Sequence, residues 1–243
     1  MGIITYNGIS NKDLGLIVQY IPSHDFPEKN ITYENIPGKN GDFIKDSKNF
    51  QNVKRVYSFA KVFKPGEPIV KSLNSIIEWL FSADTYVRLE DSYEPDYYRM
   101  AIFKNEGNLP NFYNEVSVFE VSFDCKPQCW LKSGDRPISI GSVATNLNNP
   151  TMFDSHPIIE FDATSNTDIT ITVGTNTMSL NIPNNDHVTI DCENMECYSL
   201  TQNYNKYLKL LSNAFPVLNK KTATSVAITN ATNAIIKPRW WTL

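Results

Sequence analysis

The chain has 243 residues and a formal net charge of −4, with 41% hydrophobic, 12% aromatic and 20% charged residues. This composition is typical of one large or two ordinary folded domains and excludes an intrinsically disordered chain. It supplies no basic field for nucleic acid, and no cluster of lysines or arginines stands out, so we expect no nucleic-acid-specific binding.

Membrane and export signals are also missing from the sequence. No apolar run approaches the roughly 20 residues that a membrane-spanning helix needs. Residues 1–15 lack the basic flank and apolar stretch of a signal peptide, and Tyr6 stands where the myristoylation pattern requires Ser or Thr. We therefore expect a soluble protein, made in the cytoplasm, without membrane insertion.

The N-terminal region begins with short strands and a hairpin. Residues 3–8 and 14–22 are apolar runs separated by turn formers, which favours a hairpin or a pair of strands. Further on, residues 31–36 and the residues after position 41 flank a turn-rich segment. We predict a long hairpin there that projects from the domain as an arm. The candidate turn of this arm consists of Pro37, Gly38, Asn40 and Gly41.

A strand and a helix follow. Residues 52–63 alternate, with Val53, Arg55, Tyr57, Phe59 and Lys61 on one face. From Pro68, which suits the first turn of a helix, the apolar period becomes helical, and this helix should pack on a sheet. Its predicted apolar stripe consists of Ile69, Val70, Leu73, Ile76, Ile77, Leu80 and Phe81. Residues 84–91 and 97–103 then read as strands, and the turn formers of residues 104–111 follow them.

The segment from Val116 to Pro127 has the clearest strand pattern in the chain. Phe119, Val121, Phe123 and Cys125 share one face, as expected of a half-buried strand. Because proline cannot donate to a sheet ladder, we expect the strand to end at Lys126 and Pro127. With Gly134 and Pro137 as further breakers, we place the domain boundary between residues 133 and 134.

The second domain, residues 134–243, has the pattern of an antiparallel β-sandwich. Short strands rich in Ile, Val and Thr are predicted at residues 156–163, 167–174, 177–183, 187–192 and 196–203. Residues 204–211 fit a helix or an irregular segment equally well. The fold class is therefore mainly β, with an N-terminal sandwich that carries one helix and the arm.

Neither a metal site nor a catalytic site emerges from the pattern. The four cysteines, Cys125, Cys129, Cys192 and Cys197, are spaced too loosely for a zinc knuckle, and buried free thiols are the preferred interpretation. Asp186 and His187 could form a dyad, although a solvated turn pair is the alternative we favour. We predict no cofactor and no enzymatic activity.

Three tryptophans are candidates for an interface or for stacking on sugars: Trp130, Trp240 and Trp241. Trp240 and Trp241 point to opposite faces of the last strand, so at least one should be buried. We expect a structural role first and an interface role second.

The order of these features resembles the distal tail protein (Dit) family of siphophages that infect Gram-positive bacteria. The resemblance rests on NGISNKDLGL, IPGKNGD, the helix ending in EWL, YYRMAIF, VSFDCKP and the terminal IIKPRWWTL, and covers the whole chain. It departs from the family at FPVLNKKTATSVAIT, where relatives have a glycine turn and this chain has no glycine after Gly174.

The resemblance implies a distal tail hub located in the virion at the end of the tail and assembled in the host cytoplasm. In that family, a homohexameric ring joins the tail tube to the tail-tip protein, and receptor-binding proteins are further candidate partners. It also implies a galectin-like or carbohydrate-module-like second domain. The alternative function is a carbohydrate-binding module that recognises host cell-wall saccharides.

Overall fold

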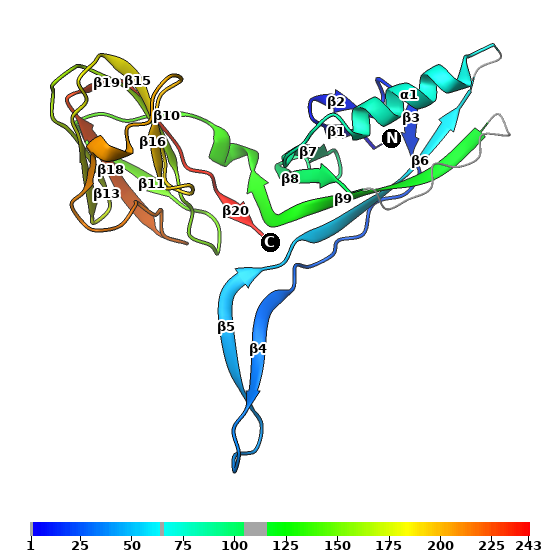
Figure 1. The fold of residues 1–243 in the computed structure, drawn as a ribbon, viewed down its shortest axis with the longest axis horizontal. Coiled ribbons are helices and arrows are strands. Elements are labelled where there is room, and N and C mark those ends of the chain that lie inside the picture. The colour runs from blue at the N-terminus through cyan, green and yellow to red at the C-terminus, as the bar shows by residue number, and fades with distance from the viewer. Residues whose placement is uncertain (1, 64–65, 105–115) are drawn as a thin grey trace. The chain divides into compact units, whose positions relative to one another are not determined.

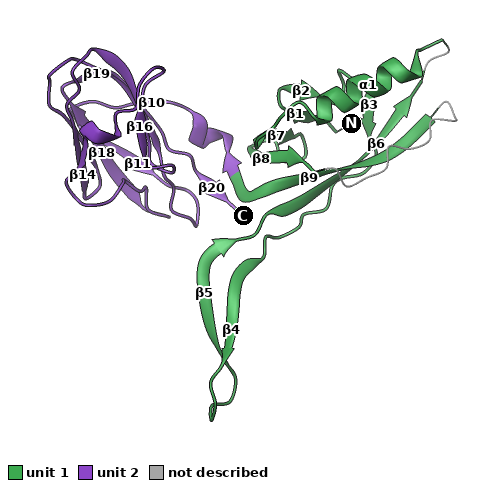
Figure 2. Ribbon diagram, viewed as in Figure 1, with its two compact units in different colours: residues 1–129, 243 green, residues 130–242 purple. Residues whose placement is uncertain are grey.

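The computed structural model describes residues 2–63, 66–104 and 116–243. It is mainly β with one α-helix among the described residues, which confirms the predicted fold class. The chain divides into unit 1, residues 1–129 and 243, and unit 2, residues 130–242 (Figure 2). The domain boundary expected from the sequence, between residues 133 and 134, stays a prediction.

Unit 1 is built on a sheet with the strand order β2-β1-β7-β8-β9-β6-β3 (Figure 1). The eighth strand of this sheet, β20, belongs to unit 2 and pairs with β9, whose last two residues also belong to unit 2. The strands are β1 (Ile4–Tyr6), β2 (Ile9–Ser10), β3 (Leu16–Val18), β6 (Val53–Val62), β7 (Val87–Asp91), β8 (Tyr97–Phe103), β9 (Val116–Leu131) and β20 (Trp241–Thr242). The face of β6 on which the alternation placed Arg55 and Lys61 is buried, so these two charged side chains lie among aromatic residues. The predicted turn at residues 104–111 lies, apart from Lys104, outside the described residues, as do residues 64–65 before the helix.

The helix α1 (Ile69–Leu80) covers the core of unit 1, but its buried face differs from the predicted stripe. Its buried residues are Ile76, Trp79 and Leu80, whereas Val70 is 69% exposed and Phe81, after the helix, 56% exposed. Pro68 precedes the first turn as an extended N-cap residue. Trp79, absent from the predicted stripe, is held because its Nε1 donates to the carbonyls of Tyr6 and Ile9, each 3.2 Å away.

Strand β9 runs past its predicted end. Phe119, Val121, Phe123 and Cys125 are buried, as the alternation predicted. The strand nevertheless continues through Pro127 to Leu131. Cys125 is the last residue of β9 that pairs with β6, so Pro127 lies beyond that ladder and its missing amide hydrogen breaks no bond there.

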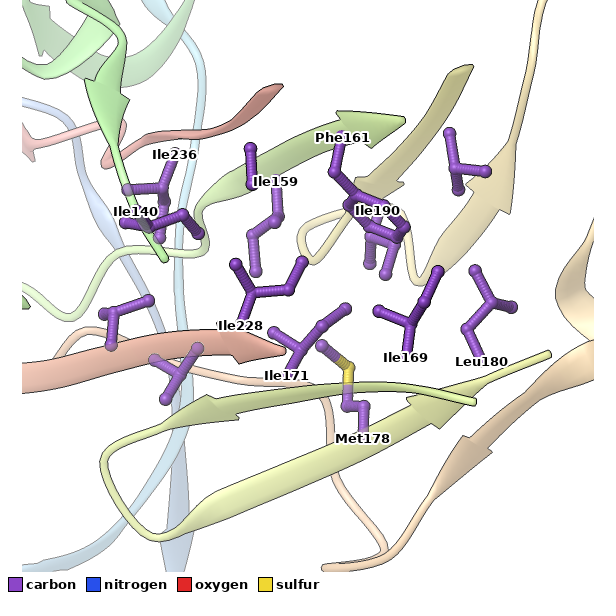
Figure 3. Close-up of a cluster of buried hydrophobic side chains, with 14 of the residues drawn as sticks. Ile140, Ile159, Phe161, Ile169, Ile171, Met178, Leu180, Ile190, Ile228 and Ile236 are labelled. Atoms are coloured by element: carbon purple, nitrogen blue, oxygen red, sulfur yellow. The ribbon is translucent and has the colours of Figure 1, made fainter. Parts of the chain in front are cut away.

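Unit 2 is a sandwich of two five-stranded sheets, which confirms the predicted β-sandwich. One sheet has the order β10-β19-β12-β15-β16 and the other β11-β18-β13-β14-β17. The strands are β10 (Ile138–Ser139), β11 (Thr145–Asn148), β12 (Ile158–Ala163), β13 (Ile169–Val173), β14 (Asn176–Leu180), β15 (Asp186–Asp191), β16 (Glu196–Tyr198), β17 (Leu208–Leu210), β18 (Ala223–Thr229) and β19 (Ala231–Lys237). Alternate side chains of both sheets, such as Ile159 and Ile171, meet in the core (Figure 3).

Short 3-10 helices complete the chain. The first, η1 (Lys132–Asp135), follows β9, and the second, η2 (Asn205–Tyr207), leads directly into β17. The ambiguous segment 204–211 is therefore one 3-10 turn and a short strand. In the region without glycine, Asn213, Lys221 and Asn230 adopt left-handed backbone conformations, with φ of 57°, 52° and 63°. Asparagine tolerates this conformation, which explains how unit 2 turns without glycine there.

Candidate functional site

The projecting arm is the candidate functional site. Strands β4 (Lys29–Asn35) and β5 (Asp42–Phe50) pair only with each other and form a separate two-stranded sheet that extends away from the main sheet of unit 1 (Figure 1). This confirms the predicted hairpin. Residues 36–41 connect the strands, and within them Gly38 and Gly41 have φ of 83° and 84°, a region that glycine adopts without strain.

Both faces of the arm expose large apolar side chains. Tyr33 and Ile44 are direct cross-strand partners, 64% and 56% exposed, and therefore share one face. Phe43 is 54% exposed and pairs with Glu34 on the other face. The residues that lead into the arm continue this character, since Tyr20, Ile21 and Phe26 are 70%, 69% and 87% exposed.

Exposure of this kind indicates a contact surface. An isolated two-stranded hairpin is marginally stable in water, and its outer edges present unpaired backbone groups that favour pairing with another chain. Clustered exposed aromatic and aliphatic residues are typical of protein interfaces. The arm can therefore gain both hydrogen bonds and buried apolar area from a partner.

A bulge near the base of the arm changes the register. Lys29 pairs with Phe50, whereas Ile31 pairs with Asp46, and Lys48 in the longer strand has a φ of 58°. Asp46 holds the bulge because it accepts a hydrogen bond from the Lys48 amide, at 2.8 Å, and lies 2.7 Å from Lys29 Nζ. The hydrogen bond from Lys29, followed by that from the Lys48 amide, lowers the pKa of Asp46.

The three tryptophans do not offer free aromatic faces. Trp130 and Trp240 are 5% and 6% exposed. Trp241 is half-buried, stacks on Phe153 with ring centroids 4.3 Å apart, and donates from Nε1 to the Asp154 carbonyl. This burial favours the structural role, and sugar stacking on Trp130 or Trp240 would require unit 2 to rearrange.

All four cysteines are buried and free. Cys125 and Cys129 lie in unit 1, and Cys192 and Cys197 lie in unit 2. Burial raises the pKa of Cys125 and Cys197 to about 12 and that of Cys129 to about 11, so the thiols are protonated at neutral pH. Within the described ranges, no group of three or more His, Cys, Asp or Glu residues is placed to hold a metal ion.

The histidines of unit 2 take part in local surface pairs. The ring of His187 lies 2.7 Å from Asp162, and its backbone amide donates to Asp186, so the Asp186–His187 dyad, which was the less favoured alternative, does not form. His156 pairs with Glu193 at 2.8 Å. The described part of the chain holds no helix with the length and apolar character for crossing a membrane.

The fold is that of phage tail proteins. It resembles the Dit protein of phage SPP1, described as a paradigm of the hub adsorption apparatus in phages infecting Gram-positive bacteria, with a TM-score of 0.76, 15% identity and 100% of both chains covered. It also resembles a chain of the phage p2 baseplate in its activated conformation. The strontium structure gives a TM-score of 0.56, 8% identity and coverage of 97% and 96%.

The p2 structure with calcium gives the same TM-score and identity, with 99% of this chain and 98% of the other covered. The likeness to SPP1 Dit confirms, at the level of the fold, the resemblance to distal tail proteins found in the sequence. No protein-family model matches the chain, and no curated protein matches it significantly.

Proposed function

We propose that the chain is a structural protein of a phage tail, a distal tail hub of which six copies close into a ring. In this proposal, residues 1–133 form the ring, which continues the tail tube on one side and holds the tail-tip protein or baseplate on the other. The C-terminal sandwiches face outward, where receptor-binding proteins are further candidate partners. The protein assembles in the host cytoplasm, resides in the virion and has no enzymatic role.

This proposal rests on the similarity of the whole fold to the hub protein SPP1 Dit. It also rests on the arm, whose large apolar side chains are exposed to solvent in the single chain. A ring of identical chains needs a heterologous contact, in which one surface of a copy meets a different surface of the next. A hairpin that adds to a neighbouring sheet makes such a contact through backbone hydrogen bonds and side-chain burial. The arm supplies both.

Native mass spectrometry of the full chain tests the proposal. We expect a closed oligomer of six 27.6 kDa chains, and a lower-order species when the arm is shortened within residues 34–47. An oligomer that is unchanged by the shortening would contradict the assignment of the arm as the ring contact.

Saccharide binding by unit 2 is a second candidate function, favoured by one observation. On the outer face of the sheet that contains β12, the carboxylate of Asp162 accepts hydrogen bonds from His187, at 2.7 Å, and from Asn233, also at 2.7 Å. His187 and Asp162 remain 54% and 42% exposed, so polar groups are available to sugar hydroxyls. Calorimetric titration of the full chain with host cell-wall saccharides tests it. We expect binding that His187→Ala weakens, and a flat response of the parent chain would remove this candidate function.

A further inference from the structure

The chain enters the arm through a segment with little packing of its own. Residues 19–28 form no strand, and of these only Pro22 is buried. After the amide of Gln19, which donates to the Ser58 carbonyl at 2.9 Å, the segment is no longer part of the sheet hydrogen bonding. Besides the buried Pro22, the polar contacts of Ser23 and His24 hold this segment to unit 1.

Arg55 of β6 makes the first of these contacts from inside unit 1. Its side chain is only 2% exposed, and Nη1 donates to the Ser23 carbonyl at 2.8 Å. Its Nη2 lies 3.3 Å from Glu94 and 3.7 Å from Asp91. Nη2 makes no hydrogen bond within the described residues, so the two carboxylates hold the guanidinium by charge. The buried group is still restricted in its movement, because a displacement would leave a charge unpaired in the interior.

Glu94 connects the same group to the next residue of the segment. It lies 2.8 Å from His24 Nδ1 and 3.7 Å from Arg99. The Tyr57 hydroxyl donates to Asp91 at 3.1 Å, which fixes the second carboxylate. Ser23 is thus attached to β6 through Arg55, and His24 is attached to the β7–β8 connection through Glu94.

The protonation states fit this arrangement. Burial by itself would lower the pKa of Arg55, but Tyr57, Glu94 and Asp91 outweigh that effect and raise it. Burial also raises the pKa of Tyr57 well above its ordinary value. The guanidinium is therefore charged and the phenol is a donor at neutral pH.

The segment that leaves the arm is held at a separate point. Asn52 Nδ2 donates to the Tyr86 hydroxyl at 2.6 Å and to Asp124 at 2.9 Å, and the Tyr86 hydroxyl donates to Asp124 at 2.8 Å. The Gln51 amide donates to the Glu28 carbonyl at 2.8 Å and so joins the two segments.

We propose that Arg55 and Tyr86 are positioning residues for the arm. Arg55, with Glu94 and Asp91, forms an entry clamp on Ser23 and His24, and Tyr86, with Asp124, forms an exit clamp on Asn52. Together the two clamps fix the direction in which the hairpin leaves unit 1. The clamps are a property of the single chain, and their importance for ring closure rests on the proposed function.

A fixed direction matters because a closed ring needs one angle between neighbours. Free rotation of the arm would permit contacts at many angles and hence open chains. It would also add an ordering cost to each contact, since a mobile segment loses conformational freedom on binding.

Double electron–electron resonance, which measures the distribution of distances between two spin labels, tests the proposal. The labels are attached to Asn40→Cys at the arm tip and Lys12→Cys on unit 1, since the native cysteines are buried. The sample is diluted with unlabelled protein and carries Ile44→Asp, so that contacts of the arm with a neighbour do not hide the effect. We expect Arg55→Met to widen the distance distribution about twofold, and Tyr86→Phe to widen it as well.

The matched control is Lys71→Met, which replaces an exposed basic side chain of α1 outside both clamps, and its distribution should equal that of the parent. If Arg55→Met does not fold, Tyr86→Phe, which removes one hydroxyl, decides the question. Unchanged distributions in the folded variants would overturn the proposal, and widening in only one would restrict it to that clamp. If these variants widen the distribution but the parent chain, without Ile44→Asp, forms no rings by native mass spectrometry, the clamps would stand and the proposed function would be removed.

Discussion

Arg55 and Trp79 show what could be predicted about single residues and what could not. Alternation placed Arg55 on the same strand face as Tyr57 and Phe59, and in the structure that face is buried. The partners that make its burial possible, Glu94, Asp91 and Ser23, are distant in the sequence, and no local pattern indicates them. Trp79 was missed because its place in the core depends on carbonyls of β1 and β2, which only the folded chain brings near.

Trp79→Phe tests the role of that residue. The change removes volume from a side chain that is 1% exposed and leaves two carbonyls without their donor, so we expect a loss of about 2–3 kcal/mol in the free energy of unfolding. Urea denaturation measures it. Val70→Ala on the same helix, at a position 69% exposed, should stay within about 0.5 kcal/mol of the parent, and equal losses in both variants would contradict this role.

Gly134 can be tested with a matched glycine. A Cβ at Gly134 would collide with the backbone nitrogen of Trp240, whereas one at Gly141 would have nothing within 4 Å. We expect Gly134→Ala to destabilise unit 2, because backbone atoms would have to move, and Gly141→Ala to leave it unchanged. Differential scanning calorimetry compares them, and a normal melting temperature for Gly134→Ala would refute the close approach.

The buried thiols predict a loss of stability in alkali. Burial raises the pKa of Cys125 from a reference of 9.0 to about 12, so the unfolded chain releases its proton at lower pH than the folded chain does. The stabilisation is complete below pH 9 and falls as the pH rises toward 12, by about 1.4 kcal/mol per pH unit for one thiol.

Urea denaturation at pH 8 and pH 10 checks this prediction. Cys125→Ala should show a smaller decrease between the two pH values than the parent does. If the variant and the parent lose equal stability, the thiol does not contribute as we argue.

At the scale of elements, patterns in the sequence predicted the strands and the hairpin, but not all of their ends. The alternation of β9 and the turn residues of the arm are local signals, and both elements formed where expected. The end of β9 was wrong because the effect of Pro127 depends on whether a neighbouring strand needs its amide. Local sequence patterns also could not predict that both Trp130 and Trp240 are buried, because their burial depends on how the end of the chain packs in unit 2.

The arm's apolar face can be tested without shortening it. Ile44 is 56% exposed, so Ile44→Asp should leave the melting temperature of the chain unchanged. It should strongly reduce assembly, because a carboxylate would be buried in the contact with a neighbour. Analytical ultracentrifugation measures the loss. Ser225→Asp, on an exposed position of unit 2, should assemble normally, and assembly of Ile44→Asp like that of the parent would exclude this face.

At the scale of the whole molecule, two mainly β units are joined in one chain, and unit 1 carries an arm whose large apolar side chains are exposed. The sequence predicted the fold class because strand, helix and turn signals are local. The direction of the arm and the clamps at its base depend on contacts between distant residues, so they could be found only in the structure.

Electron microscopy of the purified full-length protein tests the ring most directly. Images averaged without imposed symmetry should show closed particles with a central hole and six equivalent units around it. Strictly monomeric particles, at concentrations where the parent chain is fully folded, would contradict the account.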